Sequence, residues 1–110
     1  MSIPCTTTFS FEGHRIVEYK GLVRGVVVRA PTISQGIMGS LKNIVGGKIG
    51  AFQQMCETTR GEALDQLLEH AVEIGGNAVV GLRYESSEVA DAATEVICYG
   101  TAVVIEPASS

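Results

Sequence analysis

The hydrophobic positions between residues 15 and 29 alternate with polar ones. The apolar face of this segment carries Val17, Tyr19, Val23 and Val27. The opposite face carries Glu18, Lys20 and Arg24. A period of two with many β-branched residues predicts a half-buried strand over residues 15–29. Gly21 and Gly25 lie on the apolar face, so we expect a bulge or the close approach of another backbone there.

Downstream of this strand the hydrophobic period changes to three or four residues. The positions that recur are Ile33, Ile37, Leu41, Ile44 and Val45. This spacing predicts a short amphipathic helix over residues 33–45, with Thr32 as its N-cap and Gly46 as its end.

A longer helical pattern covers residues 48–74 and ends at Gly75 and Gly76. Its apolar stripe holds Ile49, Phe52, Cys56, Ala63, Leu67, Ala71 and Ile74, with Leu64 and Leu68 beside it. Another face, which we expect to be solvated, holds Glu62, Asp65, Glu69 and Glu73. Such a helix is about 40 Å long, which exceeds the expected diameter of a monomeric core. It therefore either breaks near residues 58–61 or extends along a partner subunit.

Two further strands are predicted over residues 78–85 and 95–106. A short leading strand is expected over residues 6–11 and a loose tail over residues 107–110. The last strand is apolar on both faces, which is typical of a strand that is buried on both. In a chain of 110 residues, this favours a homo-oligomer that covers the second face of the sheet. We therefore predict one α+β domain over residues 1–110, an antiparallel sheet with one long and one short helix in the order β-α-α-β-β.

Composition and charge exclude several classes of protein. Hydrophobic residues make up 45% of the chain, which excludes a disordered segment. The net charge is −4 and the eight basic residues are spread from Arg15 to Arg83, so we expect no nucleic-acid partner and no anionic membrane partner. Three widely spaced cysteines fit a reducing cytosol better than a disulfide framework. No apolar leader or spanning segment is visible, and we expect a cytoplasmic protein.

The candidate soft-metal ligands are sparse. They are Cys5, Cys56, Cys98, His14 and His70, none of them at the local spacing of a zinc site, and of these we name Cys56, Cys98 and His70. Cys56 and His70 are separated by about 21 Å along a continuous helix, so a metal site needs Cys98, a loop or ligands from neighbouring subunits. The alternative is that Cys56 and Cys98 are small buried apolar residues. No catalytic motif is visible, so an enzyme is the least supported class.

Gly46, Gly47 and Lys48 are arranged like the end of a phosphate loop. The remaining positions of that motif do not match, because Lys42 stands where glycine is needed and Ile49 where Ser or Thr is needed. Two interpretations stay open. Backbone N–H groups at a helix start, together with the lysine, can hold an anion. Alternatively, the two glycines form a tight turn between helices.

Several motifs in chain order resemble those of the YbjQ-like family, whose name describes heavy-metal binding. They are residues 12–13 (EG), 16–19 (IVEY), 21–25 (GLVRG), 42–48 (KNIVGGK), 50–52 (GAF), 75–81 (GGNAVVG) and 100–103 (GTAV). The resemblance implies a dodecin-like subunit in a homo-oligomeric ring of five, with no established reaction. It also implies a heavy-metal ion as cofactor.

The resemblance points to Glu18, Tyr19, Gly46, Gly47 and Lys48 as binding or assembly positions. The family usually has arginine where this chain has Lys48, and lysine cannot form the same two-bond contact with a carboxylate. An ion pair between Glu18 and Lys48 across a ring interface is the structural alternative. Two functional hypotheses follow from the whole sequence: a ring that binds a metal ion or small ligand at subunit interfaces, and an interaction scaffold without metal or catalysis.

Overall fold

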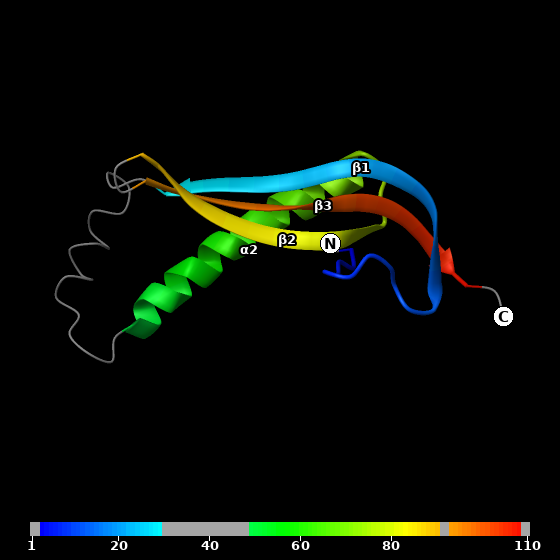
Figure 1. Cartoon of the computed structure of the whole chain (residues 1–110), viewed down its shortest axis with the longest axis horizontal. Helices are drawn as coiled ribbons and strands as arrows, with labels where there is room; N and C mark the ends of the chain where they lie inside the picture. The colour runs from blue at the N-terminus through cyan, green and yellow to red at the C-terminus, as the bar shows by residue number, and fades with distance from the viewer. Residues whose placement is uncertain (1–2, 30–48, 91–92, 109–110) are drawn as a thin grey trace.

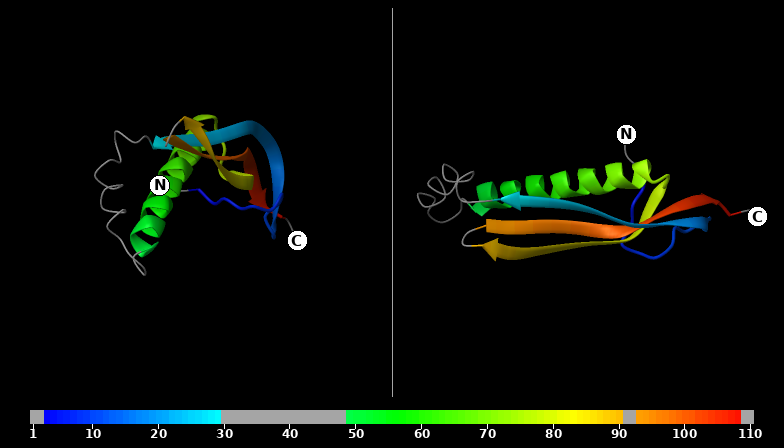
Figure 2. Two further views of the ribbon diagram at one scale, coloured as in Figure 1. Left: turned by 60° about the vertical axis from the view of Figure 1, so that its left-hand side comes forward. Right: turned by 90° about the horizontal axis from the view of Figure 1, so that it is seen from above.

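The computed structural model describes residues 3–29, 49–90 and 93–108. Four elements are described, in the order β1 (His14–Arg29), α2 (Ile49–Glu73), β2 (Ala78–Ala90) and β3 (Ala93–Pro107). The strands form an antiparallel sheet in the order β1-β3-β2, and α2 lies along one face of it (Figure 1, Figure 2). The α+β prediction is confirmed. The short helix predicted over residues 33–45, and Gly46, Gly47 and Lys48, lie outside the described residues.

β1 is half buried only in its second part. The pairing with β3 slips between Ile16 and Glu18 and again between Tyr19 and Gly21. Beyond these bulges Val23 and Val27 are buried, as the alternation predicts. For Tyr19, which lies between the two register shifts, the predicted burial is wrong, because its side chain is 70% exposed. Gly21 has a φ of 126°, which confirms the expected bulge and explains why glycine stands there.

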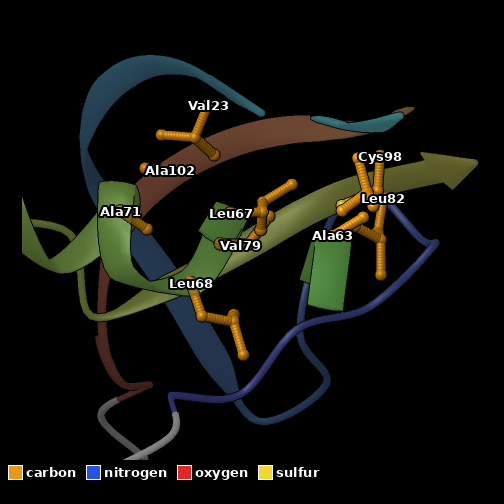
Figure 3. Packing of buried hydrophobic residues seen from close by; sticks show 10 residues of the cluster. Val23, Ala63, Leu67, Leu68, Ala71, Val79, Leu82, Cys98 and Ala102 are labelled. Carbon is orange, nitrogen blue, oxygen red and sulfur yellow. The ribbon is translucent and has the colours of Figure 1, made fainter. Parts of the chain in front are cut away.

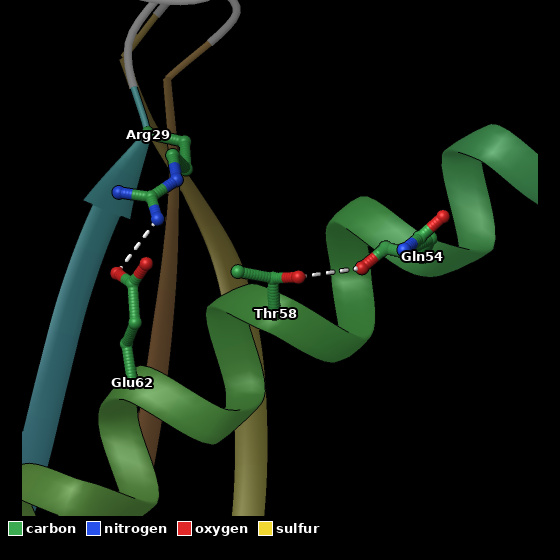
Figure 4. Close-up of polar contacts among 4 residues, drawn as sticks. All are labelled: Arg29, Gln54, Thr58 and Glu62. Carbon is green, nitrogen blue, oxygen red and sulfur yellow. Dashed lines mark hydrogen bonds and ion pairs between the residues drawn. The ribbon is translucent and has the colours of Figure 1, made fainter.

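Gly25 confirms the other expectation, a close backbone approach. A Cβ atom at this position would lie 1.8 Å from the carbonyl oxygen of Ala63 in α2. The backbone N–H of the next residue, Val26, donates a hydrogen bond of 3.0 Å to Oε1 of Gln66. At the end of β1, Arg29 forms an ion pair of 2.7 Å with Glu62 (Figure 4). These contacts fix α2 against β1.

α2 is continuous, so of the two alternatives the break near residues 58–61 is wrong. The hydroxyl of Thr58 donates to the carbonyl oxygen of Gln54 at 3.0 Å within the same helix (Figure 4). This bond within the helix accompanies continuation rather than the start of a new helix. The 25 residues give a helix of about 37 Å. The helix ends as predicted: Gly75 has a positive φ, and the N–H of Gly76 donates to the carbonyl oxygen of Ala71 at 2.8 Å.

The core lies between α2 and the sheet (Figure 3). Its main cluster contains Val23, Val27, Ala63, Leu67, Leu68, Ala71, Val79, Leu82, Cys98 and Ala102. α2 packs chiefly on β1 and β3 and barely touches β2. The described side chains from Gln53 to Thr58 are exposed, because this part of α2 diverges from the sheet (Figure 1).

The chain ends differ from the predictions. Residues 6–11 form no strand; the N-terminal segment instead makes one isolated bridge, between Cys5 and Val79 on the outer edge of β2. β2 continues five residues beyond its predicted end, to Ala90. Pro107 belongs to β3, and the N–H of Ala108 donates to the carbonyl oxygen of Gly13 at 2.9 Å. The expected loose tail is therefore wrong for these two residues, because β1 holds them.

The molecule is long and thin. Its extents are 59 × 27 × 22 Å and its radius of gyration is 17.4 Å, whereas a compact chain of this length has a radius of about 13 Å. Within the described residues, α2 is the helix that covers one face of the sheet (Figure 2). The opposite face, called the open face below, is made up of Leu22, Arg24, Val26, Val28, Glu85, Ile97 and Tyr99.

Candidate functional site

The motif positions on β1 are solvent-exposed and lie near the C-terminal end of α2. Oε2 of Glu18 accepts an ion pair of 2.9 Å from Nζ of Lys20 on the same strand. The side chain of Lys20 passes within reach of Gly75, where α2 ends. A cation there interacts favourably with the C-terminal end of the helix dipole. The expected partner of Glu18, Lys48, lies outside the described residues, so that ion pair stays a prediction.

The three metal candidates are not brought together. Cys98 is 0% exposed in the core, Cys56 is exposed on the diverging part of α2, and His70 is half-buried near the other end of that helix. Because α2 is continuous, Cys56 and His70 stay about 21 Å apart in one subunit. The alternative that each cysteine is a small buried apolar residue is confirmed for Cys98 and wrong for Cys56. The described residues contain no group of three or more His, Cys, Asp or Glu side chains that could hold a metal ion.

Two cysteines, Cys5 and Cys98, contact the core from different segments of the chain. Cys5 packs against the cluster that contains Cys98. Burial raises the pKa of the Cys98 thiol, the backbone N–H of Gly25 lowers it, and the neighbouring Cys5 raises it again. The two cysteines are 93 positions apart in the chain. Cys5 is bridged to Val79 on the outer edge of β2, and Cys98 lies on β3, on the other side of β2.

Tyr84 lies beside Cys98. It is the direct cross-strand partner of Cys98 on the neighbouring strand, so the two side chains share the face toward α2. Burial raises the pKa of the Tyr84 hydroxyl, and the charges of Cys98 and Cys5 raise it further. The positive charge of Arg60 on α2 lowers the same pKa. The phenol therefore lies near the buried thiol of Cys98 on the next strand and near the cationic side chain of Arg60 on the helix.

A groove opens between α2 and β2, where the two elements barely touch. It has a volume of about 530 Å³ and is lined by Glu57, Arg60, Gly61, Leu64 and Tyr84. A smaller pocket of about 70 Å³ shares Arg60 and Tyr84 with it. The groove offers one cation, one carboxylate and one phenol above an apolar side chain. Its residues were not singled out by sequence reasoning, because a groove depends on where α2 crosses the sheet.

The open face combines exposed apolar side chains with one strong polar contact. Leu22 is 62% exposed and Val28 is 46% exposed. The hydroxyl of Tyr99 donates to Oε2 of Glu85 at 2.6 Å. This hydrogen bond is the main cause that raises the pKa of Tyr99, with smaller contributions from desolvation and from the charge of Glu85. Exposed aliphatic side chains beside a tyrosine that is held by a hydrogen bond are typical of a protein–protein association surface.

Comparisons with known proteins agree with the motifs and the fold. A family model described as "Putative heavy-metal-binding" matches residues 3–106. A UPF0145 protein of Legionella pneumophila (strain Lens) is 57% identical over 105 residues, which cover 96% of this chain and all of the relative. A UPF0145 protein of Francisella philomiragia is 49% identical and covers 91% of this chain and 96% of its own length.

A solved structure shares the fold at lower identity. It is a protein of unknown function of the DUF74 family from Pediococcus pentosaceus, with a TM-score of 0.61 and 21% identity, covering 94% of this chain and 98% of its own. Among the described residues, no helix is both long and apolar enough to cross a membrane.

Proposed function

Because the chain belongs to the YbjQ family, we propose that it is a homo-oligomeric binding protein. Its subunits associate through the open face and hold a thiophilic metal ion or a small ligand where they meet. We expect a ring of five, since the family resemblance implies that number. We assign it to the cytoplasm, since Cys5, Cys56 and Cys98 are all free thiols.

The open face is the observation that carries this proposal. Leu22 and Val28 expose apolar surface that nothing in the described part of the chain covers. β3 is apolar on both faces, yet its Ile97 and Tyr99 are only half-buried within the subunit. The described part of the chain supplies no second layer for this face, and a second copy would supply one.

Native mass spectrometry of tag-free protein tests the assembly. We expect a single species at a multiple of 11.6 kDa, and we expect Leu22→Lys to shift it to the monomer. Val72→Lys is the matched control, because Val72 is also partly exposed but lies on α2. A monomeric wild type, or an unchanged assembly in Leu22→Lys, contradicts the proposal.

The same spectra, recorded before and after addition of Zn²⁺ or Cu⁺, test the ligand. Mass added at a fixed ratio to the assembled subunits supports a bound metal at their interfaces. Assembly that stays metal-free favours the second candidate, an interaction scaffold with neither metal nor catalysis. One observation favours that candidate: no described group of three His, Cys, Asp or Glu side chains could hold an ion within one subunit.

A further inference from the structure

We propose that the groove between α2 and β2 binds a small zwitterion with an apolar side chain, of the class of the free aliphatic and aromatic amino acids. The proposed function holds its ligand where subunits meet, whereas this groove lies within one subunit and needs no metal. Its walls are one face of α2 and the strand β2, at the place where the helix begins to diverge from the sheet (Figure 1).

The shape of the groove suits a small molecule. Its volume of about 530 Å³ falls within the range of about 300–1,000 Å³ that is usual for small-molecule sites. Its lining residues on α2 stand three and four positions apart and therefore share one face of the helix; they are Glu57, Arg60, Gly61 and Leu64. The space above Gly61 is open, because a Cβ atom there would meet nothing within 4 Å. Tyr84, which is 40% exposed, forms the wall on β2.

Two opposite charges in the groove are available to a ligand. Glu57 and Arg60 stand one turn apart on α2, a spacing at which such side chains can pair. The cations that form ion pairs among the described residues are nevertheless Arg15, Lys20 and Arg29, and neither Glu57 nor Arg60 takes part. An amino acid carries both complementary charges on one carbon atom. Its carboxylate can accept two hydrogen bonds from the guanidinium of Arg60, and its ammonium group can pair with Glu57.

Leu64 and Tyr84 fit the rest of such a molecule. Leu64 is half-buried, packs against the core cluster and also lines the groove. The ring of Tyr84 lines the opposite wall, so an apolar side chain between the two is removed from water on both sides. The Tyr84 hydroxyl forms no hydrogen bond with the described residues. Burial raises its pKa above the ordinary value of 10.0, so at neutral pH it is protonated and can donate to the carboxylate of the ligand.

The charges around Arg60 disfavour other classes of ligand. Glu57 lines the groove and Glu85 lines the smaller pocket beside it. Among these lining residues two carboxylates therefore stand against one guanidinium, and they repel a phosphate dianion. A neutral apolar molecule would cover Arg60 and Glu57 without giving either charge a partner, which costs free energy. A zwitterion satisfies both charges and adds no net charge to the site.

Equilibrium dialysis of the full-length protein against probes of matched shape tests the ligand class. Free phenylalanine has both charges, 3-phenylpropionate lacks the ammonium group, and phenethylamine lacks the carboxylate. We expect phenylalanine to bind at least about tenfold more tightly than either analogue, because each analogue leaves one charge of the groove without a partner. Absence of binding by both free phenylalanine and free leucine at millimolar concentration overturns the proposal. An analogue that binds as tightly as phenylalanine also overturns it.

Variants of the two charged residues test the role of each. Arg60→Gln should weaken the binding of phenylalanine at least about tenfold. Glu57→Gln should remove the preference for phenylalanine over 3-phenylpropionate, which a merely structural change would not do. Arg24→Gln is the matched control, because Arg24 is exposed on the open face, and it should bind as the wild type does. Unchanged binding in Arg60→Gln, or an equal loss in Arg24→Gln, overturns the proposal.

Leu22→Lys keeps this proposal separate from the proposed function. We expect its monomer to bind phenylalanine as the wild type does, since the lining residues of the groove all belong to one subunit. Loss of binding in that monomer would show that the site needs a neighbouring subunit, and would overturn the proposal. A wild type that is monomeric and still binds phenylalanine contradicts the proposed function and supports this site.

Discussion

The face of the sheet under α2 and the open face use side chains of different size. Under the helix stand Gly25, Cys98 and Ala102, which let the backbone of α2 approach closely. The open face carries Leu22 and Tyr99 at comparable positions along β1 and β3, and α2 does not reach them. Small residues therefore mark the points where α2 lies closest to the sheet, and larger exposed ones mark the face that α2 leaves uncovered.

Shortening a leucine on each side gives the largest contrast. Leu67→Ala removes a fully buried side chain, and we expect it to lower the free energy of unfolding by about 3 kcal/mol. Leu22→Ala should change the intrinsic stability by less than about 0.5 kcal/mol but weaken association. Urea unfolding at several chain concentrations separates the two effects. Equal losses in both variants, independent of concentration, would contradict the distinction between the faces.

Adding one methyl group under the helix should have the next largest effect. Gly25→Ala places a carbon against the Ala63 carbonyl, and α2 must move, at a cost of about 2 kcal/mol. Gly61→Ala is the control, because its added Cβ meets nothing within 4 Å. There we expect a gain of up to about 1 kcal/mol from helix propensity. A Gly25→Ala protein as stable as wild type would show that α2 is not held at this contact.

The ion pair at the end of β1 should contribute less. Arg29 and Glu62 are both partly solvated, so we expect Glu62→Gln to cost about 0.5 kcal/mol. The loss should shrink as salt rises. A double-mutant cycle with Arg29→Gln isolates the pair. A coupling energy of zero at low salt would mean that α2 is oriented by the Gly25 contact alone.

The change with the smallest expected effect on stability at neutral pH is the loss of the Tyr99 hydrogen bond on the open face. The folded protein raises the pKa of Tyr99 above its ordinary value of 10.0, mainly because the phenol donates to Glu85. The contribution of this hydrogen bond to the free energy of unfolding is therefore fully present below about pH 10. It is lost as the pH rises through the raised pKa of Tyr99 in the folded protein. Unfolding midpoints against pH should show this loss in wild type and a smaller one in Tyr99→Phe. An identical alkaline profile in both proteins would remove the role of this hydrogen bond.

Most of the fold follows from local patterns. The alternation over residues 15–29, the stripe on α2 and the glycines at its end are local signals, and the structure confirms the elements they predict. The exposure of Tyr19 in the first half of β1 could not be predicted, because it depends on where the pairing with β3 shifts register. The continuity of α2 through Thr58 could not be predicted either, because a threonine hydroxyl serves as well within a helix as at its start.

The candidate sites were less accessible from the sequence. Cys98 was correctly assigned to the core, because an apolar run surrounds it. Cys56 was not, because the stripe on α2 continues past the point where the helix leaves the sheet. The contact of Cys5 with the core and the groove beside Tyr84 arise only when distant segments meet. No hydrophobic period and no residue spacing in the sequence indicates such sites.

The position of β3 also sets the order in which the molecule can form. β1 pairs with one side of β3, beginning at the pair His14–Pro107, and β2 pairs with the other side. Neither earlier strand can complete its pairing before β3 is present. During synthesis, β1 and β2 leave the ribosome as unpaired edges, and the sheet closes only when residues beyond 93 emerge. Contacts at such long sequence separation make folding slow. The cooperative folding step therefore begins when the complete chain has left the ribosome, and not with the growth of a helix.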